Sequence, residues 1–341
     1  MKDDSDTEDR PFDVSVIVIA YNRKQYIMKA LDSIRTKDSQ NFKIEIIVVK
    51  NFIDAAMDHE LNGIAKTVIT TDKITLGAKM ALGIKSSTSE ILMFLEDDDI
   101  FLDGKFTSVI NRFKDSNVGF VHNGYSIIDE QGAFLRRSRR RNQVHSLNVK
   151  DQRNIFKILN MRGNFNLSCM SIRKGLVIEY LEDLEQFQVA SDNFLFYIAI
   201  DSTFSLDILE EELSGYRIHN SNHSISSIFP FRDFVSSKIS FLTEDIKALL
   251  KIEKILKNSN AKDVISVRIL IPEMVAASLD SKFPDSLRAL KVGSLIVSSI
   301  RFRNFIFLTG YFIFLSSRII PDSGKILYFI LERVMVKLNR I

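Results

Sequence analysis

Four adjacent acidic residues, Glu96 to Asp99, directly follow a run of five apolar residues, ILMFL, at 91–95. Continuous apolar runs of this kind are typical of strands buried on both faces of a parallel sheet. Open parallel sheets bind their ligands at the carboxyl ends of the strands, which is where the acidic run lies. Neighbouring carboxylates repel one another, and a hard cation such as Mg²⁺ or Mn²⁺ would offset that repulsion. The alternative is an acidic surface turn that caps the next helix.

The segments around the acidic run alternate between two kinds of pattern. Continuous apolar runs predict strands, and apolar residues at helical spacing predict helices. In chain order we predict a strand at 14–19, a helix around 27–34, strands at 44–49 and 67–71, a helix at 76–85, a strand at 91–95 and a helix around 106–113. This alternation is typical of βαβ units, so we expect an α/β fold with a mostly parallel sheet flanked by helices.

The middle of the chain is less regular. Residues 118–128 predict two strands joined by a turn near Gly124, and 166–173 predict one strand. A helix is predicted at 191–200, followed by a strand through the alternating Phe204, Leu206 and Ile208. Beyond about residue 231 the strand patterns stop and helical patterns run to the end, which predicts a helical C-terminal extension.

The composition narrows the function classes. The chain has 341 residues, with 46 Lys and Arg against 43 Asp and Glu, and this near-balance argues against a nucleic-acid-binding protein. The single cysteine, Cys169, excludes an internal disulfide, and together with only five histidines it makes a zinc site a poor fit.

Four segments, in this order along the chain, resemble blocks of the family-2 glycosyltransferases of the GT-A fold. They are VSVIVIAYNRKQYIMKALDSI, GAKMALGIKSSTSEILMFLEDDDIF, GNFNLSCMSIRKGL and GYRIHNSNHS, and together they cover roughly residues 12–228. The resemblance implies a Rossmann-like sheet and an inverting sugar transfer from a nucleotide-diphosphate sugar to an acceptor hydroxyl, of the hexosyltransferase type. It also implies a DxD-type metal motif that works with Mg²⁺ or Mn²⁺.

The resemblance assigns donor-side roles to two segments. Within the acidic run, it implies that Asp98 contacts the metal that bridges the donor diphosphate and that Glu96 and Asp97 lie near the ribose or help to hold the metal. After the first strand, the nucleotide-contacting turn corresponds to Ala20, Tyr21, Asn22 and Arg23. Tyr21 is then expected to stack on a base and Arg23 to reach phosphate, with simple packing as the alternative for Tyr21.

Three residues later in the chain match functional positions of the family. The resemblance implies that Asp192 is the general base that takes the proton of the acceptor hydroxyl. The alternative is that Ser191 and Asp192 only begin a helix, since both residue types favour N-caps. His219 is implied as a metal ligand or a phosphate contact, with Arg217 beside it as a donor-binding residue.

One segment departs from the family. The paired acids expected after the second strand are replaced by Lys50 and Asn51. Readout of the donor's base and ribose is therefore expected to differ, and Asp72, after the third strand, is the candidate that supplies an acid instead. The donor base stays open.

Two basic segments suggest contacts beyond the donor site. Residues 136–141, RRSRRR, predict contact with an anionic acceptor or a membrane surface, with a solvated loop as the alternative. The tail at 301–341 combines phenylalanines with flanking cations, which is typical of a helix lying in a membrane interface. The alternative is that the tail packs on the catalytic domain or forms a dimer interface.

These observations predict a domain layout and a location. We expect a disordered acidic tip at 1–11, a GT-A domain at 12–230 and a helical region at 231–341. The acceptor is expected to be a glycan or a lipid-linked molecule, and the enzyme to be cytoplasmic or peripheral on the cytoplasmic face of a membrane. Two other functions remain open. One is a catalytically inactive protein that binds a sugar nucleotide or a membrane partner. The other is a sugar-phosphate nucleotidyltransferase, which usually has a glycine-rich loop where this chain reads AYNRKQY.

Overall fold

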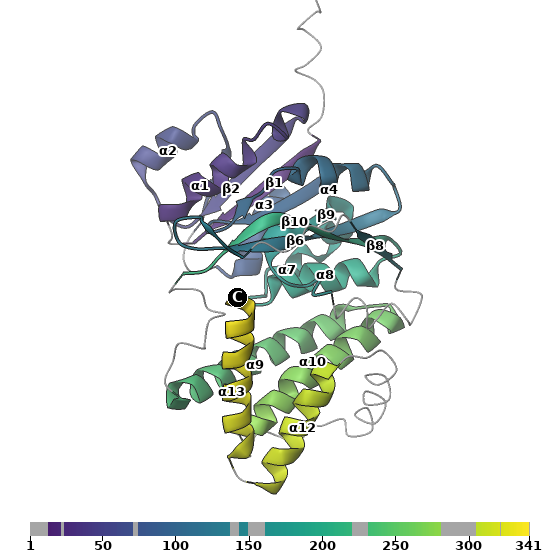
Figure 1. The fold of residues 1–341 in the computed structure, drawn as a ribbon. Helices are drawn as coiled ribbons and strands as arrows, with labels where there is room; N and C mark the ends of the chain where they lie inside the picture. Colours follow the sequence, from purple (N-terminus) through teal and green to yellow (C-terminus); the bar gives the residue numbers. More distant parts are fainter. Residues whose placement is uncertain are drawn as a thin grey trace, which may run out of the picture. The chain divides into compact units, whose positions relative to one another are not determined.

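The computed structural model describes residues 13–21, 24–70, 74–136, 143–148, 161–219, 231–280, 305–320 and 322–340. The chain divides into two compact units. The first comprises residues 1–148 and 163–217 and contains the sheet, and the second comprises 149–162 and 218–341 and contains long helices (Figure 1).

The first unit is built on one mixed sheet. Its strands are β1 (Val14–Ala20), β2 (Ile44–Lys50), β3 (Lys66–Ile69), β4 (Ile91–Glu96), β5 (Ile100–Phe101), β6 (Val118–Ile128), β7 (Phe134–Arg136), β8 (Val144–Leu147), β9 (Met170–Arg173) and β10 (Ser205–Arg217). The order is β3-β2-β1-β4-β9-β6-β10-β5, with β7 beside β6 and β8 beside β10. Strands β1 to β4 are parallel, as predicted, and so are β6 and β10. The other pairs are antiparallel, because β9 runs against both of its neighbours and β5, β7 and β8 are short returning strands.

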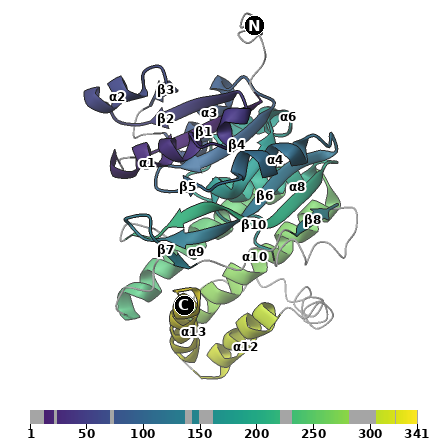
Figure 2. The same cartoon turned by 45° about the horizontal axis from the view of Figure 1, so that its top comes forward.

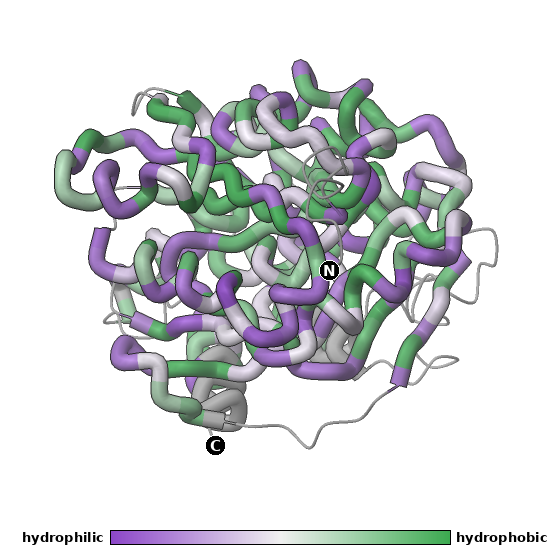
Figure 3. Tube along the Cα trace, turned by 90° about the horizontal axis from the view of Figure 1, so that it is seen from above, coloured by the Kyte–Doolittle hydropathy of each residue, from purple (hydrophilic) through white to green (hydrophobic). Residues whose placement is uncertain are grey.

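Helices cover both faces of this sheet (Figure 1). They are α1 (Lys24–Ile34), α2 (Ala55–Leu61), α3 (Leu76–Ser86), α4 (Lys105–Phe113), α6 (Lys174–Val177), α7 (Leu181–Leu184) and α8 (Ser191–Asp201). Alternate residues of β1 point to opposite faces, so Val16 and Val18 pack in one core with residues of α1 and α4. Ile17 faces α3, where a Cβ at Gly83 would lie 2.4 Å from it. Short hydrophobic and hydrophilic stretches alternate along the chain, as expected for amphipathic helices around buried strands (Figure 3).

Residues 118–128 form one continuous strand, β6, so the predicted turn near Gly124 is wrong. Gly124 lies where the register of β6 against β10 shifts, between the pairs of Leu209 and Glu212. A Cβ at Gly124 would approach the carbonyl oxygen of Glu210 to 2.9 Å and that of Glu211 to 3.0 Å. The glycine therefore makes room for a bulge in the neighbouring strand. The predicted strand at 166–173 is also shorter than expected, because a 3₁₀ turn at Leu167–Cys169 precedes β9.

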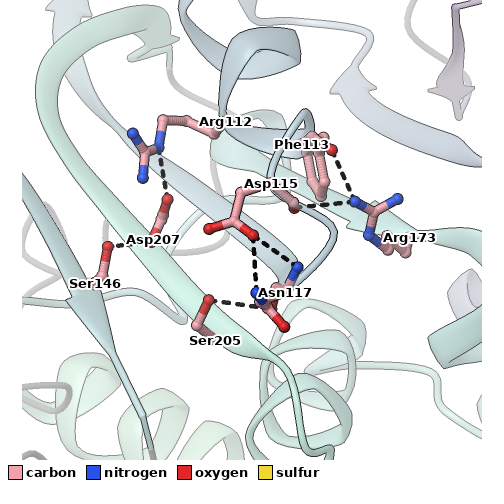
Figure 4. Close-up of polar contacts among 8 residues, drawn as sticks. All are labelled: Arg112, Phe113, Asp115, Asn117, Ser146, Arg173, Ser205 and Asp207. Carbon is pink, nitrogen blue, oxygen red and sulfur yellow. Dashed lines mark hydrogen bonds and ion pairs between the residues drawn. The ribbon is translucent and has the colours of Figure 1, made fainter.

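Arg112 and Arg173 connect α4 and the turn after it to strands of the sheet (Figure 4). The Arg112 Nε donates to the buried Asp207 of β10 at 2.6 Å, and the Ser146 Oγ of β8 donates to the same carboxylate at 2.6 Å. Arg173 donates to the carbonyl oxygens of Phe113 at 2.7 Å and Asp115 at 3.2 Å (Figure 4). It thereby satisfies the carbonyl group of Phe113, the last residue of α4, and joins the turn that follows the helix.

The second unit consists, in its described part, of α9 (Phe231–Ile255), α10 (Ser259–Leu279), α12 (Phe305–Ile319) and α13 (Ser323–Arg340). Leu242, Ala276 and Leu279 form one buried cluster, and Met274, Ala277 and Phe314 form another. Both clusters centre on α10, which is therefore the inner helix of the unit. No helix in the described ranges is both long enough and apolar enough to cross a membrane.

Candidate active site

The acidic run forms the turn between β4 and β5, beside the end of β1. The buried Asp97 accepts a hydrogen bond at Oδ2 from the backbone N–H of Tyr21, at 3.0 Å. The backbone N–H of Asp97 donates to the carbonyl oxygen of Ile19, at 3.3 Å. The turn is therefore joined to the carboxyl ends of two adjacent parallel strands, β1 and β4, which is where open α/β sheets bind ligands.

Arg217, the last residue of β10, binds the backbone of this turn. Its guanidinium is buried and donates from Nε to the carbonyl oxygen of Asp98, at 2.6 Å. The Nη1 atom donates to the carbonyl oxygens of Asp129, at 2.8 Å, and Glu130, at 3.0 Å, and the guanidinium carbon lies 4.9 Å from the ring centroid of Tyr26. These contacts give Arg217 a role in fixing the backbone of Asp98. The predicted role of Arg217 in donor binding stays a prediction.

Asp99 is the buried member of the acidic run that is bound from two sides. Its Oδ1 accepts the backbone N–H of Arg217 at 3.0 Å, and its Oδ2 accepts the Asn166 amide at 2.9 Å. Burial, and after it the neighbouring charge of Asp98, raise the pKa of Asp99 to about 7, although hydrogen bonds from Arg217, Asn166 and Ser168 oppose the rise. Asp98 is also buried, at 6% exposed, and its charge acts on the Asp99 carboxyl group. The pair concentrates negative charge at one point.

Asn166 and Ser168 were given no role in the sequence analysis, yet they support the turn. Asn166 has a left-handed φ of 63°, which asparagine tolerates better than most residues, and its side-chain oxygen accepts the N–H of Ser168 at 2.6 Å. The Ser168 hydroxyl in turn accepts the backbone N–H of Glu96, at 3.0 Å. Below them lies the buried Lys105, which donates to the Asn123 side chain and to the Ser168 carbonyl oxygen. Burial lowers the pKa of Lys105 to about 8.

Tyr21 and Lys79 are in contact beside the end of β1, and the sequence analysis named only Tyr21. Tyr21 follows Ala20, the buried last residue of β1, and its ring is 43% exposed rather than packed in the core. The Nζ of the buried Lys79, on α3, lies 3.7 Å from the centroid of that ring. A cation at this distance attracts the ring's π face and holds the ring in place.

Lys50 and its neighbours, which replace the family's paired acids, are engaged with one another. The buried Lys50 side chain forms an ion pair with Asp58 of α2 and lies 4.9 Å from the ring centroid of Phe52. Asp54 caps α2 by accepting the N–H of Met57, at 3.2 Å, and pairs with Lys24 at 3.0 Å. The hydrogen bond from Lys24 lowers the pKa of Asp54, and the hydrogen bond from Lys50 lowers that of Asp58. These charges therefore fasten α2 to the sheet.

Asp192 lies in the first turn of α8, as predicted, and is half-buried. The N-cap position is occupied by Ala190, with φ 61° and no side-chain hydrogen bond, so neither Ser191 nor Asp192 is the N-cap. The Asp192 Oδ1 accepts the N–H of the next residue, Asn193, at 2.8 Å. A carboxylate in the first turn of a helix is stabilised in its ionised form, which is the form that a general base needs.

The remaining predicted site residues are less fully described. His219 is buried and lies two residues after Arg217, but it falls in the second unit, and its role as a metal ligand stays a prediction. Asn22, Arg23 and Asp72 lie outside the described residues, and so do residues 137–141 of the basic loop, whose first residue, Arg136, ends β7.

The acidic turn fits a hard cation that also binds phosphate. Within the described ranges, no three His, Cys, Asp or Glu side chains converge as a preformed metal cage. Mg²⁺ does not need such a cage, because one or two carboxylates are enough when water and substrate phosphates supply the other ligands. Asp98, with Asp97 and Glu96 next to it, matches that donor set. A cation there would also relieve the repulsion that raises the pKa of Asp99.

Comparison with known proteins gives a family. The model of glycosyl transferase family 2 matches residues 15–181, which include β1, the acidic turn and β9. An uncharacterized glycosyltransferase of Rickettsia bellii is 29% identical over 124 residues, which cover 36% of this chain and 18% of that protein. One from Nostoc sp. is 24% identical over 230 residues, which cover 63% of this chain and 67% of the relative. The match thus spans less than a fifth of the length of the Rickettsia bellii protein.

Solved structures resemble the fold. Residues 1–349 of Staphylococcus aureus TarS, in a structure in complex with UDP-GlcNAc, superpose with a TM-score of 0.54 at 16% identity, and cover 80% of this chain and 77% of that one. A structure of the same TarS region with UDP gives a TM-score of 0.51 at 14% identity. The mixed sheet with helices on both faces is therefore of the GT-A type. The family model also covers the strands that hold the acidic turn, and residues 15–181 therefore match the family-2 glycosyltransferases.

Proposed function

We propose that this protein transfers a sugar from a nucleotide-diphosphate sugar to an acceptor hydroxyl, with inversion at the sugar carbon. The observation that carries the proposal is the acidic turn at the ends of β1 and β4, joined to the Tyr21 backbone and held from behind by Arg217. Carboxylates at this edge of the sheet suit a metal-bound diphosphate. The exposed Tyr21 ring beside them suits a nucleoside base.

The proposed chemistry divides between two parts of the first unit. On the acceptor side, Asp192 takes the proton of the attacking hydroxyl, whose oxygen bonds to the sugar carbon as the diphosphate leaves from the opposite face. On the donor side, Tyr21 and Lys79 orient the nucleoside, and Arg217 keeps the Asp98 backbone in place. A Mg²⁺ or Mn²⁺ ion held by Asp98 would supply neutralisation of the charge that grows on the departing diphosphate.

The proposal also covers the chemical class of the donor and of the acceptor. UDP-sugars are the first donors to test, because the TarS structures hold UDP-GlcNAc and UDP. A hexose is the proposed transferred group, and a glycan or lipid-linked molecule is the proposed acceptor. We also propose a cytoplasmic enzyme that attaches peripherally to the membrane, and the exposed helical surface described below supports the attachment.

Nucleotide binding tests the donor side directly. We would titrate the full chain with UDP, GDP, dTDP and CDP by calorimetry, with and without Mn²⁺ or Mg²⁺. The expected result is metal-dependent binding of one nucleotide, which weakens by about tenfold or more in Asp98→Asn because one carboxylate ligand is lost. Turnover with the corresponding sugar donors would then identify the sugar.

Asp103→Asn is the matched control, since Asp103 is an exposed acid in the turn that follows β5. It changes the net charge by the same amount, and we expect it to leave nucleotide affinity unchanged. Equal loss of affinity in both variants would show that the effect is one of overall charge. Absence of binding to all four nucleotides, with either metal, would contradict the proposal and favour a protein that does not use a nucleotide donor.

A further inference from the structure

The outer sides of α12 and α13 carry large apolar side chains that no other part of the described chain covers. On α12 these are Phe312, Leu315 and Ile319, spaced three and four residues apart, and on α13 they are Ile326 and Ile330. With Ile320, which lies between the helices, these six residues form what we call the apolar hairpin face. Their exposed fractions lie between 41% and 80%.

The two helices are anchored on their other sides. On α12, Phe314 packs with Met274 and Ala277 of α10. At the start of α13, Gly324 approaches α10 so closely that a Cβ there would lie 2.5 Å from the carbonyl oxygen of Ser278. The packed sides fix which sides remain outward. An outward stripe on a globular helix is normally polar, so an apolar one indicates a binding surface.

Cations border this face. The described side chains of Arg318, Lys325 and Arg333 lie on the same two helices, and between residues 305 and 340 the sequence has five Lys and Arg against two acids. The guanidinium carbon of Arg318 lies 5.1 Å from the ring centroid of Phe314, and that of Arg333 lies 4.5 Å from the ring centroid of Phe329. Each guanidinium is thus held against an aromatic ring of its own helix, and Lys325 pairs with Asp322 at 2.6 Å.

We propose that the apolar hairpin face docks on a membrane surface that contains anionic lipids. Phe, Leu and Ile side chains on one side of a helix enter the boundary between headgroups and acyl chains, while neighbouring Lys and Arg pair with anionic headgroups. A second copy of this chain fits less well, because a symmetric contact through the same face would bring the same cations together. The proposal does not depend on the sugar-transfer chemistry, but it rests on the peripheral attachment proposed above and deepens it by naming the surface and the lipid class.

Vesicle co-sedimentation of the full chain tests the proposal. The probes are vesicles of phosphatidylcholine alone and vesicles of phosphatidylcholine mixed with phosphatidylglycerol. We expect binding to the mixed vesicles that weakens with added salt, and much weaker binding to phosphatidylcholine alone. Phe312→Glu is expected to lower the partition coefficient for mixed vesicles about tenfold or more. An aromatic ring that enters the membrane in the wild type is then replaced by an anion.

Phe241→Glu is the matched control, because Phe241 is an exposed phenylalanine (50%) on α9 of the same unit. It makes the same chemical change outside the apolar hairpin face and is expected to keep vesicle binding. If Phe312→Glu does not fold by circular dichroism, Ile319→Ser takes its place, since Ile319 is 80% exposed.

Three results would overturn the proposal. The wild-type chain fails to bind either kind of vesicle, or the two glutamate variants lose binding equally. Alternatively, light scattering shows a dimer that Phe312→Glu converts to a monomer without vesicle binding by the wild type. Calorimetry with UDP on the same preparations separates these outcomes from a failure of the donor-site proposal, since the Phe312→Glu variant is expected to bind nucleotide normally.

Discussion

Asp98 and Asp99 are adjacent in sequence but have different surroundings. The Asp99 carboxylate is bound by the Arg217 backbone and the Asn166 amide, and its pKa rises to about 7. At Asp98 the backbone carbonyl is the group held, by the Arg217 guanidinium. The Asp99 carboxylate therefore stabilises the turn through hydrogen bonds, and the Asp98 carboxylate is the one proposed to bind a cation. The sequence, which shows four similar acids, does not distinguish these roles.

Asp192→Asn tests the proposed base. We expect kcat to fall by about a hundredfold or more, because the amide does not accept the proton of the acceptor hydroxyl, while the affinity for the nucleotide is unchanged. Initial rates with a UDP-sugar donor, alongside calorimetry with UDP, measure the two quantities.

Asp183→Asn is a suitable control for this prediction, because Asp183 lies in the first turn of α7, the helix before α8. It should retain activity. A normal kcat in Asp192→Asn would rule out Asp192 as the base, and equal losses of nucleotide affinity and rate would point to a structural role.

The close approach of α3 to α7 links Lys79, which lies on α3 beside Tyr21, to the segment that leads into α8. A Cβ at Gly77 would lie 1.8 Å from the carbonyl oxygen of Leu184, and the Gly77 N–H donates to the carbonyl oxygen of Phe187 at 2.8 Å. Gly77→Ala therefore forces the backbones apart. We expect it to lower the free energy of unfolding by about 2 kcal/mol and to weaken UDP binding, since Lys79 moves with α3. Urea unfolding and calorimetry measure both effects.

Gly175→Ala provides the comparison, because a Cβ at Gly175 in α6 would meet no atom within 4 Å. Alanine in an unobstructed helical position is expected to keep or slightly raise stability. Similar destabilisation by both substitutions would mean that the contact with α7 is not the cause.

The elements that the sequence predicted well are those with a strong local signal. Strands β1, β2 and β4 are mostly apolar runs, and the structure places each within a residue or so of its predicted bounds. The bulge near Gly124 was mistaken for a turn, because a glycine in a strand has the same local signature in either case. Whether Gly124 lies in a turn or opposite a bulge depends on how β10, which is distant in sequence, pairs with β6.

The supporting residues of the site were missed for a related reason. Asn166 and Ser168 belong to a segment that was predicted as a strand and matched to a family block, and their partners, Asp99 and Glu96, are distant in sequence. A polar pair just before a buried strand is the one local signal they offered. The contacts of Lys50 with Asp58 and Phe52 were likewise not foreseen, because they depend on the position of α2.

Each of the two units has apolar clusters of its own among the described residues. The apolar cluster of the sheet unit includes residues of β1, α1 and α4, and the helical unit has its own clusters around α10. Separate cores predict that damage to one leaves the chemistry of the other largely intact.

Leu279→Ala examines this separation. Leu279 is 1% exposed in the helical core, so we expect a loss of about 2–5 kcal/mol in the stability of that unit. UDP affinity should be unchanged at temperatures where the variant is folded. Thermal unfolding followed by circular dichroism and calorimetry with UDP are the measurements.

The control is Leu315→Ala, at a site that is 41% exposed, where a much smaller loss is expected. If Leu279→Ala abolishes UDP binding while the sheet unit stays folded, the two units are energetically coupled rather than independent.

The position of β9 has a consequence for synthesis of the chain. This strand lies between β4 and β6, although it follows both in sequence. Until residues 170–173 leave the ribosome, β4 and β6 lack the strand that lies between them. Their backbone groups at Leu92 and Met93 and at Phe120 and Val121 cannot yet pair with β9. A nascent chain at that stage presents two apolar, unpaired strand edges, which are templates for aggregation. Translation through this interval is the period in which chaperone protection matters most.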